Sequence, residues 1–96
     1  MMITPTHFGR VDIHEAPHGI NIVIDTQDAI YIGRFDNTDG FEAILHDCAK
    51  HAISPGIDPE IFVKETAKYG VSVELKDLRL PTSSVKRVRI LGDVGA

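Results

Sequence analysis

The chain has 96 residues, which is enough for one domain and too few for two. Hydrophobic residues make up 43% and charged residues 25%, an ordinary balance for a globular protein. The formal net charge of −4 argues against broad electrostatic wrapping of duplex nucleic acid, but it is compatible with a local basic patch or a few stacked bases. A domain this small buries a modest fraction of its surface, which favours oligomerisation.

The sequence also predicts where the protein works. No long uncharged run indicates a bilayer-spanning helix, and the first residues lack the basic and then apolar pattern of a signal peptide. Cys48 is the single cysteine, so an internal disulfide framework is excluded and a reducing compartment is favoured. We therefore expect a cytoplasmic protein without a membrane partner.

The chain begins with a predicted lead-in over residues 1–18. Within it, residues 10–15 alternate in hydrophobicity, with Val11 and Ile13 on one side, which indicates a short strand. The Ala-Pro-His-Gly run at 16–19 then breaks this strand.

Two strands are predicted over residues 20–25 and 29–35, with a turn between them. The first alternates isoleucines with other residues, so its two faces differ. The second is rich in β-branched and aromatic residues, and Gly33 inside it indicates a sharp bend or a close backbone approach. Residues 36–40 are a strong turn signal.

Residues 41–51 support two interpretations. Ile44 and Cys48 have helical spacing, whereas the odd-numbered apolar residues from Phe41 onward have strand spacing. Because two strands and a turn precede this segment, we favour a strand through about Cys48. The alternative is a helix over residues 39–52, which would give an α+β sandwich in place of a barrel.

One helix is predicted over residues 58–69. Asp58 is a suitable N-cap, and Pro59 stands at the first helical position, where its missing N–H is harmless. Gly70 suits the left-handed conformation that ends many helices. The helix is therefore expected to begin and end within this segment.

Two further strands, over residues 71–80 and 84–91, complete the pattern and are joined by a very short link. Five short, bent antiparallel strands favour a small barrel over an open sheet, because an open sheet would leave edges that need protection. The predicted fold is mainly β: a small bent five-stranded antiparallel barrel in one domain over residues 1–96, with an insertion at 49–70 that contains the helix.

Two segments resemble a known family. Residues 28–47 contain a bent strand with Gly33, an acidic turn with Asp39, and a strand that ends in the Leu-His-Asp step at 45–47. Residues 80–90 contain a short strand, a tight knuckle and another short strand. These segments resemble the first and second signatures of the Sm/LSm family.

The resemblance implies an Sm-like barrel that forms a cyclic homo-oligomer, in which the fourth strand of one copy pairs with the fifth strand of the next. It also implies binding of single-stranded RNA. Glu42 stands near the family's turn Asn, and Pro81 and Thr82 stand where the family has Arg-Gly, so the family's uridine pocket is divergent or lost. With the basic cluster of the last strand, the candidate RNA-binding residues are Asp39, Phe41, Thr82 and Lys86.

Each of these candidates has a second interpretation. Phe41 could stack on a base beside Asp39, or it could start a core strand while Asp39 only makes the turn. Lys86, Arg87 and Arg89 form the densest basic cluster, which could face phosphates. Alternatively, this cluster could guard an edge strand by charge or pair across a subunit interface.

The sequence favours binding over catalysis. His46, Cys48 and His51 suggest a metal site by proximity, but they lack a fourth ligand at the usual zinc spacing. We find no nucleophile turn, phosphate-cradling glycine loop or dinucleotide fingerprint. We therefore expect no metal, cofactor or enzymatic activity. The alternative function is a homo-oligomeric assembly or scaffold module that uses the same barrel without nucleic acid.

Overall fold

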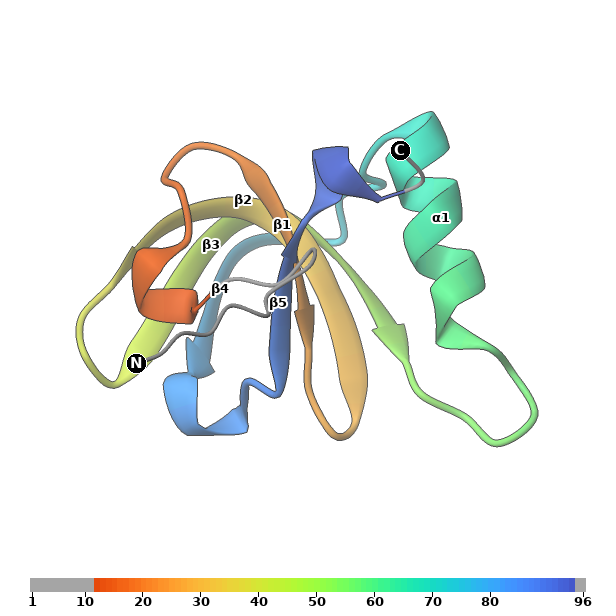
Figure 1. Cartoon of the computed structure of the whole chain (residues 1–96), viewed down its shortest axis with the longest axis horizontal. Helices are drawn as coiled ribbons and strands as arrows, with labels where there is room; N and C mark the ends of the chain where they lie inside the picture. The colour runs from red at the N-terminus through yellow and green to blue at the C-terminus, as the bar shows by residue number, and fades with distance from the viewer. Residues whose placement is uncertain (1–11, 95–96) are drawn as a thin grey trace, which may run out of the picture.

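The computed structural model describes residues 12–94, which form one five-stranded antiparallel sheet with the strand order β4-β3-β2-β1-β5 (Figure 1). This arrangement confirms the prediction of a mainly β fold with five strands and one inserted helix. The strands are β1 (Asn21–Asp25), β2 (Ala29–Thr38), β3 (Glu42–Ala52), β4 (Leu75–Pro81) and β5 (Arg87–Ile90). The helices are α1 (Pro59–Tyr69) and the 3-10 helices η1 (Ile13–Glu15), η2 (Thr82–Ser84) and η3 (Leu91–Asp93).

The sheet is curved but not closed. β4 and β5 stand at its two edges, and within residues 12–94 neither pairs with the other. The two edge strands are consecutive in the chain, and the short segment that joins them contains the 3-10 helix η2. Figure 1 shows the turn between β2 and β3 at one end of the long axis and α1 at the other.

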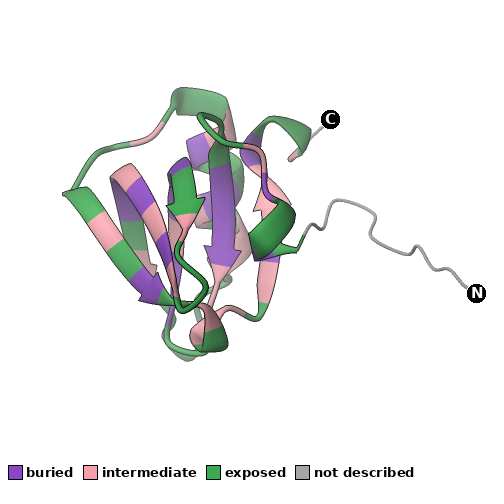
Figure 2. Ribbon diagram, turned by 90° about the vertical axis from the view of Figure 1, so that its left-hand side faces the viewer, coloured by how far each residue is buried: buried purple, intermediate pink, exposed green. Residues whose placement is uncertain are grey.

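Apolar side chains pack on both faces of the sheet. The first set, which we call the inner cluster, includes Ile22, Ile24, Phe35, Leu45 and Cys48. The second set, the helix-side cluster, joins the sheet to α1 and consists of Val23, Ile30, Ile32, Val63 and Leu91. The central strands are therefore buried on both faces, while exposed residues gather on turns and edges (Figure 2).

Gly33 allows the backbones of β2 and β3 to approach closely. A Cβ atom at this position would lie 2.3 Å from Cys48 Sγ and 3.0 Å from Cys48 Cα. The strand register also shifts between Ile32 and Arg34, which leaves two residues of β3 opposite Gly33. Such a β-bulge bends the strand and increases its twist. The predicted close approach at Gly33 is confirmed.

The predicted strand at residues 10–15 is wrong over its described part. Residues 13–15 form η1, because the Asp12 side chain accepts a hydrogen bond of 2.9 Å from the backbone N–H of His14 and caps the turn. Residues 10 and 11, with the rest of the lead-in up to residue 11, lie outside the described residues.

The ambiguous segment after the second strand is a strand. β2 extends to Thr38, so the predicted turn at 36–40 is confined to its last residues. β3 continues to Ala52, beyond the predicted end at Cys48, because it pairs with β2 over its whole length. The alternative helix over 39–52 is therefore wrong, and the segment between β3 and β4 begins after Ala52 and not at residue 49.

The inserted helix has the predicted caps. The Asp58 carboxylate accepts a hydrogen bond of 2.9 Å from Glu60 N–H, and Pro59 is the first residue of α1. Gly70 has φ 96°, and its N–H donates to the Thr66 carbonyl at 2.9 Å. Among the residues that the structure describes, no helix combines the length and apolar character needed to cross a bilayer.

Both C-terminal strands begin later than predicted. β4 starts at Leu75 and not at residue 71, because Val71 packs against the helix-side cluster. β5 starts at Arg87 and not at residue 84, because residues 82–84 coil into η2. The Val85 N–H donates to the Thr82 carbonyl at 3.2 Å and closes this turn.

We predict that Gly33→Ala lowers the free energy of unfolding by about 1–3 kcal/mol, because the added methyl group overlaps the Cys48 side chain. Adding Cys48→Ala removes the 2.3 Å contact but keeps the 3.0 Å contact with the backbone, so it should restore part of the loss. Urea unfolding of the single and double variants measures both effects. Unchanged stability of Gly33→Ala would contradict the prediction.

Candidate functional site

Three of the four candidate RNA-binding residues lie close together, where the turn between β2 and β3 contacts η2. Asp39 and Phe41 lie in the turn between β2 and β3, and Thr82 opens η2. The backbone N–H of Thr82 donates to the Phe41 carbonyl at 2.8 Å, and the Thr82 hydroxyl donates to the same oxygen at 3.2 Å. Two distant stretches of sequence are thus fastened to each other at this point.

Asp39 fixes the shape of the turn. One carboxylate oxygen accepts hydrogen bonds from the backbone N–H groups of Glu42, at 2.8 Å, and Phe41, at 3.0 Å. These bonds to the ionised form, first that of Glu42 and then that of Phe41, lower the pKa of Asp39. The turn therefore carries a negative charge next to Phe41 at neutral pH.

Phe41 is presented to solvent and does not belong to the core. It precedes β3, and 84% of its surface is exposed. The alternative in which Phe41 starts a core strand is therefore wrong. Its backbone is held on one side by Asp39 and on the other by Thr82, so an aromatic ring stands on a fixed turn.

Arg79 adds a cation that the sequence analysis missed. Its guanidinium lies 3.3 Å from a carboxylate oxygen of Glu42 and 3.9 Å from one of Asp39. Arg79 stands on β4, opposite Ile44 of β3. Only this cross-strand pairing brings it to the turn, and no local motif signals that pairing.

His46 bridges three strands on the same part of the sheet. Its Nε2 lies 2.9 Å from a carboxylate oxygen of Asp36 on β2, and its Nδ1 lies 2.8 Å from one of Asp77 on β4. A neutral imidazole can donate from one nitrogen only, so two carboxylate partners select the imidazolium. The hydrogen bonds with Asp36 and Asp77 accordingly raise the pKa of His46.

Lys86, the fourth candidate, lies apart from Phe41. It stands between η2 and β5, and its backbone N–H donates to the Asp25 carbonyl at 2.8 Å. Its side chain lines a hollow together with the turn between β1 and β2. The structure therefore divides the four candidates into a group of three and a separate lysine.

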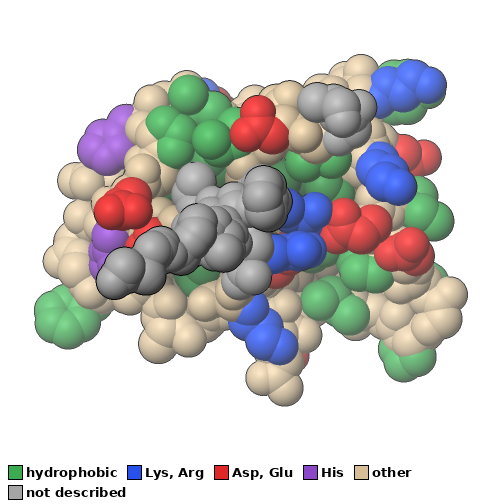
Figure 3. All heavy atoms as spheres, viewed as in Figure 1, with side chains coloured by type: hydrophobic (Ala, Val, Ile, Leu, Met, Phe, Trp, Pro, Cys, Tyr) green, Lys and Arg blue, Asp and Glu red, His purple; other side chains and the backbone are tan. Residues whose placement is uncertain are grey.

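The other two cations of the basic cluster are engaged in ion pairs. Arg87 pairs with Asp25 and, at 3.3 Å, with Glu60, and Arg89 binds Glu60 at 2.8 Å and Asp25 at 3.4 Å. The hydrogen bond from Arg89 lowers the pKa of Glu60. Figure 3 shows cationic and acidic side chains side by side on this face. These arginines connect β5 to β1 and α1, and their ion pairs with Asp25 and Glu60 compete with any binding of phosphate.

The residues considered for a metal do not converge. His46 lies in its carboxylate bridge, Cys48 packs in the inner cluster, and His51 stacks on Phe62 with ring centroids 4.9 Å apart. Burial raises the pKa of Cys48 to about 11, which keeps the thiol protonated and unreactive at neutral pH. Within residues 12–94, no three His, Cys, Asp or Glu side chains form a group that could hold a metal ion.

No family model matches the chain, and no curated protein matches it.

We predict that His46 stabilises the sheet at mildly acidic and neutral pH and that this contribution disappears on alkalinisation. A folded-state pKa above the ordinary value of about 6.5 means that the contribution is complete below that pH and is lost as pH rises through the raised pKa. Urea midpoints measured from about pH 6 to 9 should fall for the natural chain and less for His46→Gln. His14→Gln is the control, and equal slopes in all three proteins would contradict the prediction.

Proposed function

We propose that the chain is a divergent Sm-like protein that assembles into a closed ring and binds single-stranded RNA. The contact between Phe41 and Thr82 carries this proposal, because it joins the two segments whose sequences resemble the family signatures. The curved five-stranded sheet, with its short connection through η2, is compatible with this assignment.

The two sheet edges support ring assembly. β4 and β5 each have one strand neighbour among the described residues, so each carries backbone groups that another strand can pair with. Pairing β4 of one copy with β5 of the next uses different surfaces on the two partners, and such a contact closes into a ring when the rotation fits. β5 has four residues, so the new ladder would be short.

Phe41 supports binding to unpaired bases. Phe41 is 84% exposed and its backbone is held from both sides, so little backbone freedom is lost when a base stacks on its ring. Stacking of one base on an aromatic side chain contributes about 1–3 kcal/mol and tolerates any base sequence. A ring would place one such aromatic residue on every subunit.

A second candidate is an assembly module that binds no nucleic acid. Two observations favour it: Phe41 is flanked by the carboxylates of Asp39 and Glu42, and both arginines of β5 are paired with acidic residues. Negative charge beside Phe41 opposes the approach of a phosphate backbone. In this case the exposed ring would serve contact with another protein.

The mass in solution, measured by light scattering, tests the assembly. We expect about five to seven copies of the 10.6 kDa chain, because a head-to-tail contact has to close. A monomer or a simple dimer would remove the structural basis of the ring for both candidates.

Fluorescence anisotropy with short U-rich and A-rich RNA, at about 50 and 200 mM salt, separates the two candidates. Phe41→Ala should weaken RNA binding roughly 5- to 150-fold, which corresponds to one lost stacking contact. Tyr69→Ala is the matched control, because Tyr69 is an aromatic residue with 76% exposure at the end of α1. A ring that binds no RNA at low salt would exclude RNA binding and leave the assembly module.

A further inference from the structure

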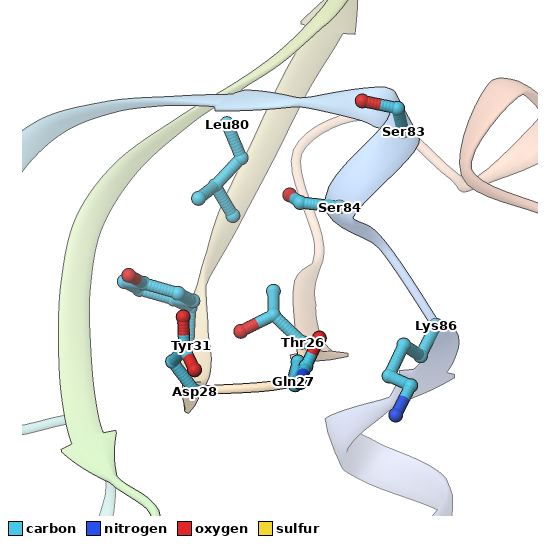
Figure 4. A pocket seen from close by; sticks show the side chains of 8 residues that line it. All are labelled: Thr26, Gln27, Asp28, Tyr31, Leu80, Ser83, Ser84 and Lys86. Carbon is cyan, nitrogen blue, oxygen red and sulfur yellow. The ribbon is translucent and has the colours of Figure 1, made fainter.

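A second site lies on the other side of η2 from Phe41. The turn between β1 and β2, the start of β2 and the segment from η2 to β5 surround a pocket of about 380 Å³ (Figure 4). Thr82 opens η2 and contacts Phe41, whereas Ser83 and Ser84 of the same turn line the pocket. The pocket and the Phe41 turn are thus neighbours along η2.

One wall of the pocket is apolar and firmly held. Leu80 belongs to the inner cluster with 7% exposure, and Tyr31 packs against the same cluster. The Lys50 ammonium lies 5.7 Å from the centre of the Tyr31 ring. Figure 4 shows the Tyr31 ring and the Leu80 side chain bordering the same hollow. A flat, partly apolar group can bury its surface against this wall.

Opposite charges stand at the two ends of the pocket. Figure 4 places Asp28 beside Tyr31 and Lys86 on the far side, with Gln27 between them. Within residues 12–94, neither Asp28 nor Lys86 forms an ion pair, although both backbones are fixed: Asp28 by the Ile53 N–H at 2.9 Å and Lys86 by the Asp25 carbonyl at 2.8 Å. The ligand that fits has an anionic group at one end and N–H donors at the other.

We propose that this pocket binds a nucleotide whose base carries an exocyclic amino group, as adenine, cytosine and guanine do. The base lies against Tyr31 and Leu80, its amino group donates to the Asp28 carboxylate, and the phosphate meets the Lys86 ammonium and the Ser83 hydroxyl. The Gln27 amide supplies a donor to a base nitrogen or oxygen. The choice of a nucleotide rests on the proposed RNA binding, and it adds a base preference to it.

Uracil is disfavoured by the same chemistry. A carboxylate can only accept hydrogen bonds, and uracil presents a carbonyl oxygen where cytosine presents the amino group. Two acceptors would therefore face each other at Asp28. The pocket discriminates between bases, whereas stacking on Phe41 does not.

The test uses mononucleotides and the full chain. In two-dimensional amide NMR, adenosine and cytidine monophosphates should shift the resonances of Gln27, Asp28 and residues 83–86. Uridine monophosphate should bind roughly tenfold more weakly. Equal binding of the three nucleotides, shifts confined to the Phe41 turn, or no shifts at all would overturn the inference.

Two substitutions test whether the phosphate of the ligand lies at Lys86 and its base amino group at Asp28. Lys86→Gln should weaken the binding of all three nucleotides to the same degree. Asp28→Asn should reduce the difference in affinity between cytidine and uridine monophosphates, because an amide can donate a hydrogen bond to the uracil oxygen. Lys64→Gln on α1 and Asp93→Asn in η3 are exposed charge-matched controls outside the pocket. Unchanged discrimination in Asp28→Asn would overturn the assigned orientation.

These experiments can disprove the nucleotide pocket without disproving the proposed function, and the reverse. Mononucleotide binding that depends on Lys86, in a chain that neither assembles nor binds RNA through Phe41, would uphold the pocket and identify a free nucleotide as its ligand. Tight RNA binding that is lost in Phe41→Ala and unchanged in Lys86→Gln would uphold the proposed function and overturn the pocket. An A-rich RNA that requires both residues would identify the RNA strand as the source of the nucleotide.

Discussion

The close approach of β2 and β3 at Gly33 is the constraint on which the fold depends. The Cys48 side chain occupies the space that a side chain at Gly33 would need, and the adjoining bulge places Asp47 in the left-handed region, with φ 53°. Arg34 binds the Asp47 carboxylate at 2.8 Å and holds the bulge from outside. A bend at this point lets two long strands curve around one small inner cluster, which a flat sheet of this size could not enclose.

Ion pairs hold the edge strand β5 in place. β5 lies against β1, with Arg87 opposite Asp25, so both arginines of β5 reach the carboxylates of Asp25 and Glu60. With 13% of its side chain exposed, Arg89 is largely removed from water, and a buried cation of this kind persists only when it is paired. The same contacts attach α1 to the sheet. The cations that look most suited to RNA in the sequence therefore serve the fold.

The sequence predicted correctly those features of the fold that depend on residues close together in the chain. The caps of α1, the close approach at Gly33 and the strand identity of β3 follow from side chains that act on their immediate neighbours. The boundaries of β4 and β5 do not, because packing of Val71 under α1 and the coiling of η2 decide where pairing starts. The contacts of Arg79 and His46 could not be predicted from the sequence either, since they join residues that only strand pairing brings together.

The division of the candidate residues by η2 also bears on how a nucleic acid would lie on the surface. The Phe41 turn offers an aromatic ring beside acidic groups, so it suits the uncharged face of a base. Across η2, Lys86 offers a positive charge without an ion pair among the described residues. A strand that stacked one base on Phe41 would carry its next phosphates away from Asp39 and Glu42. In the proposed mode of binding, Lys86 would offer these phosphates a cation beside η2, whereas the arginines of β5 are engaged with Asp25 and Glu60.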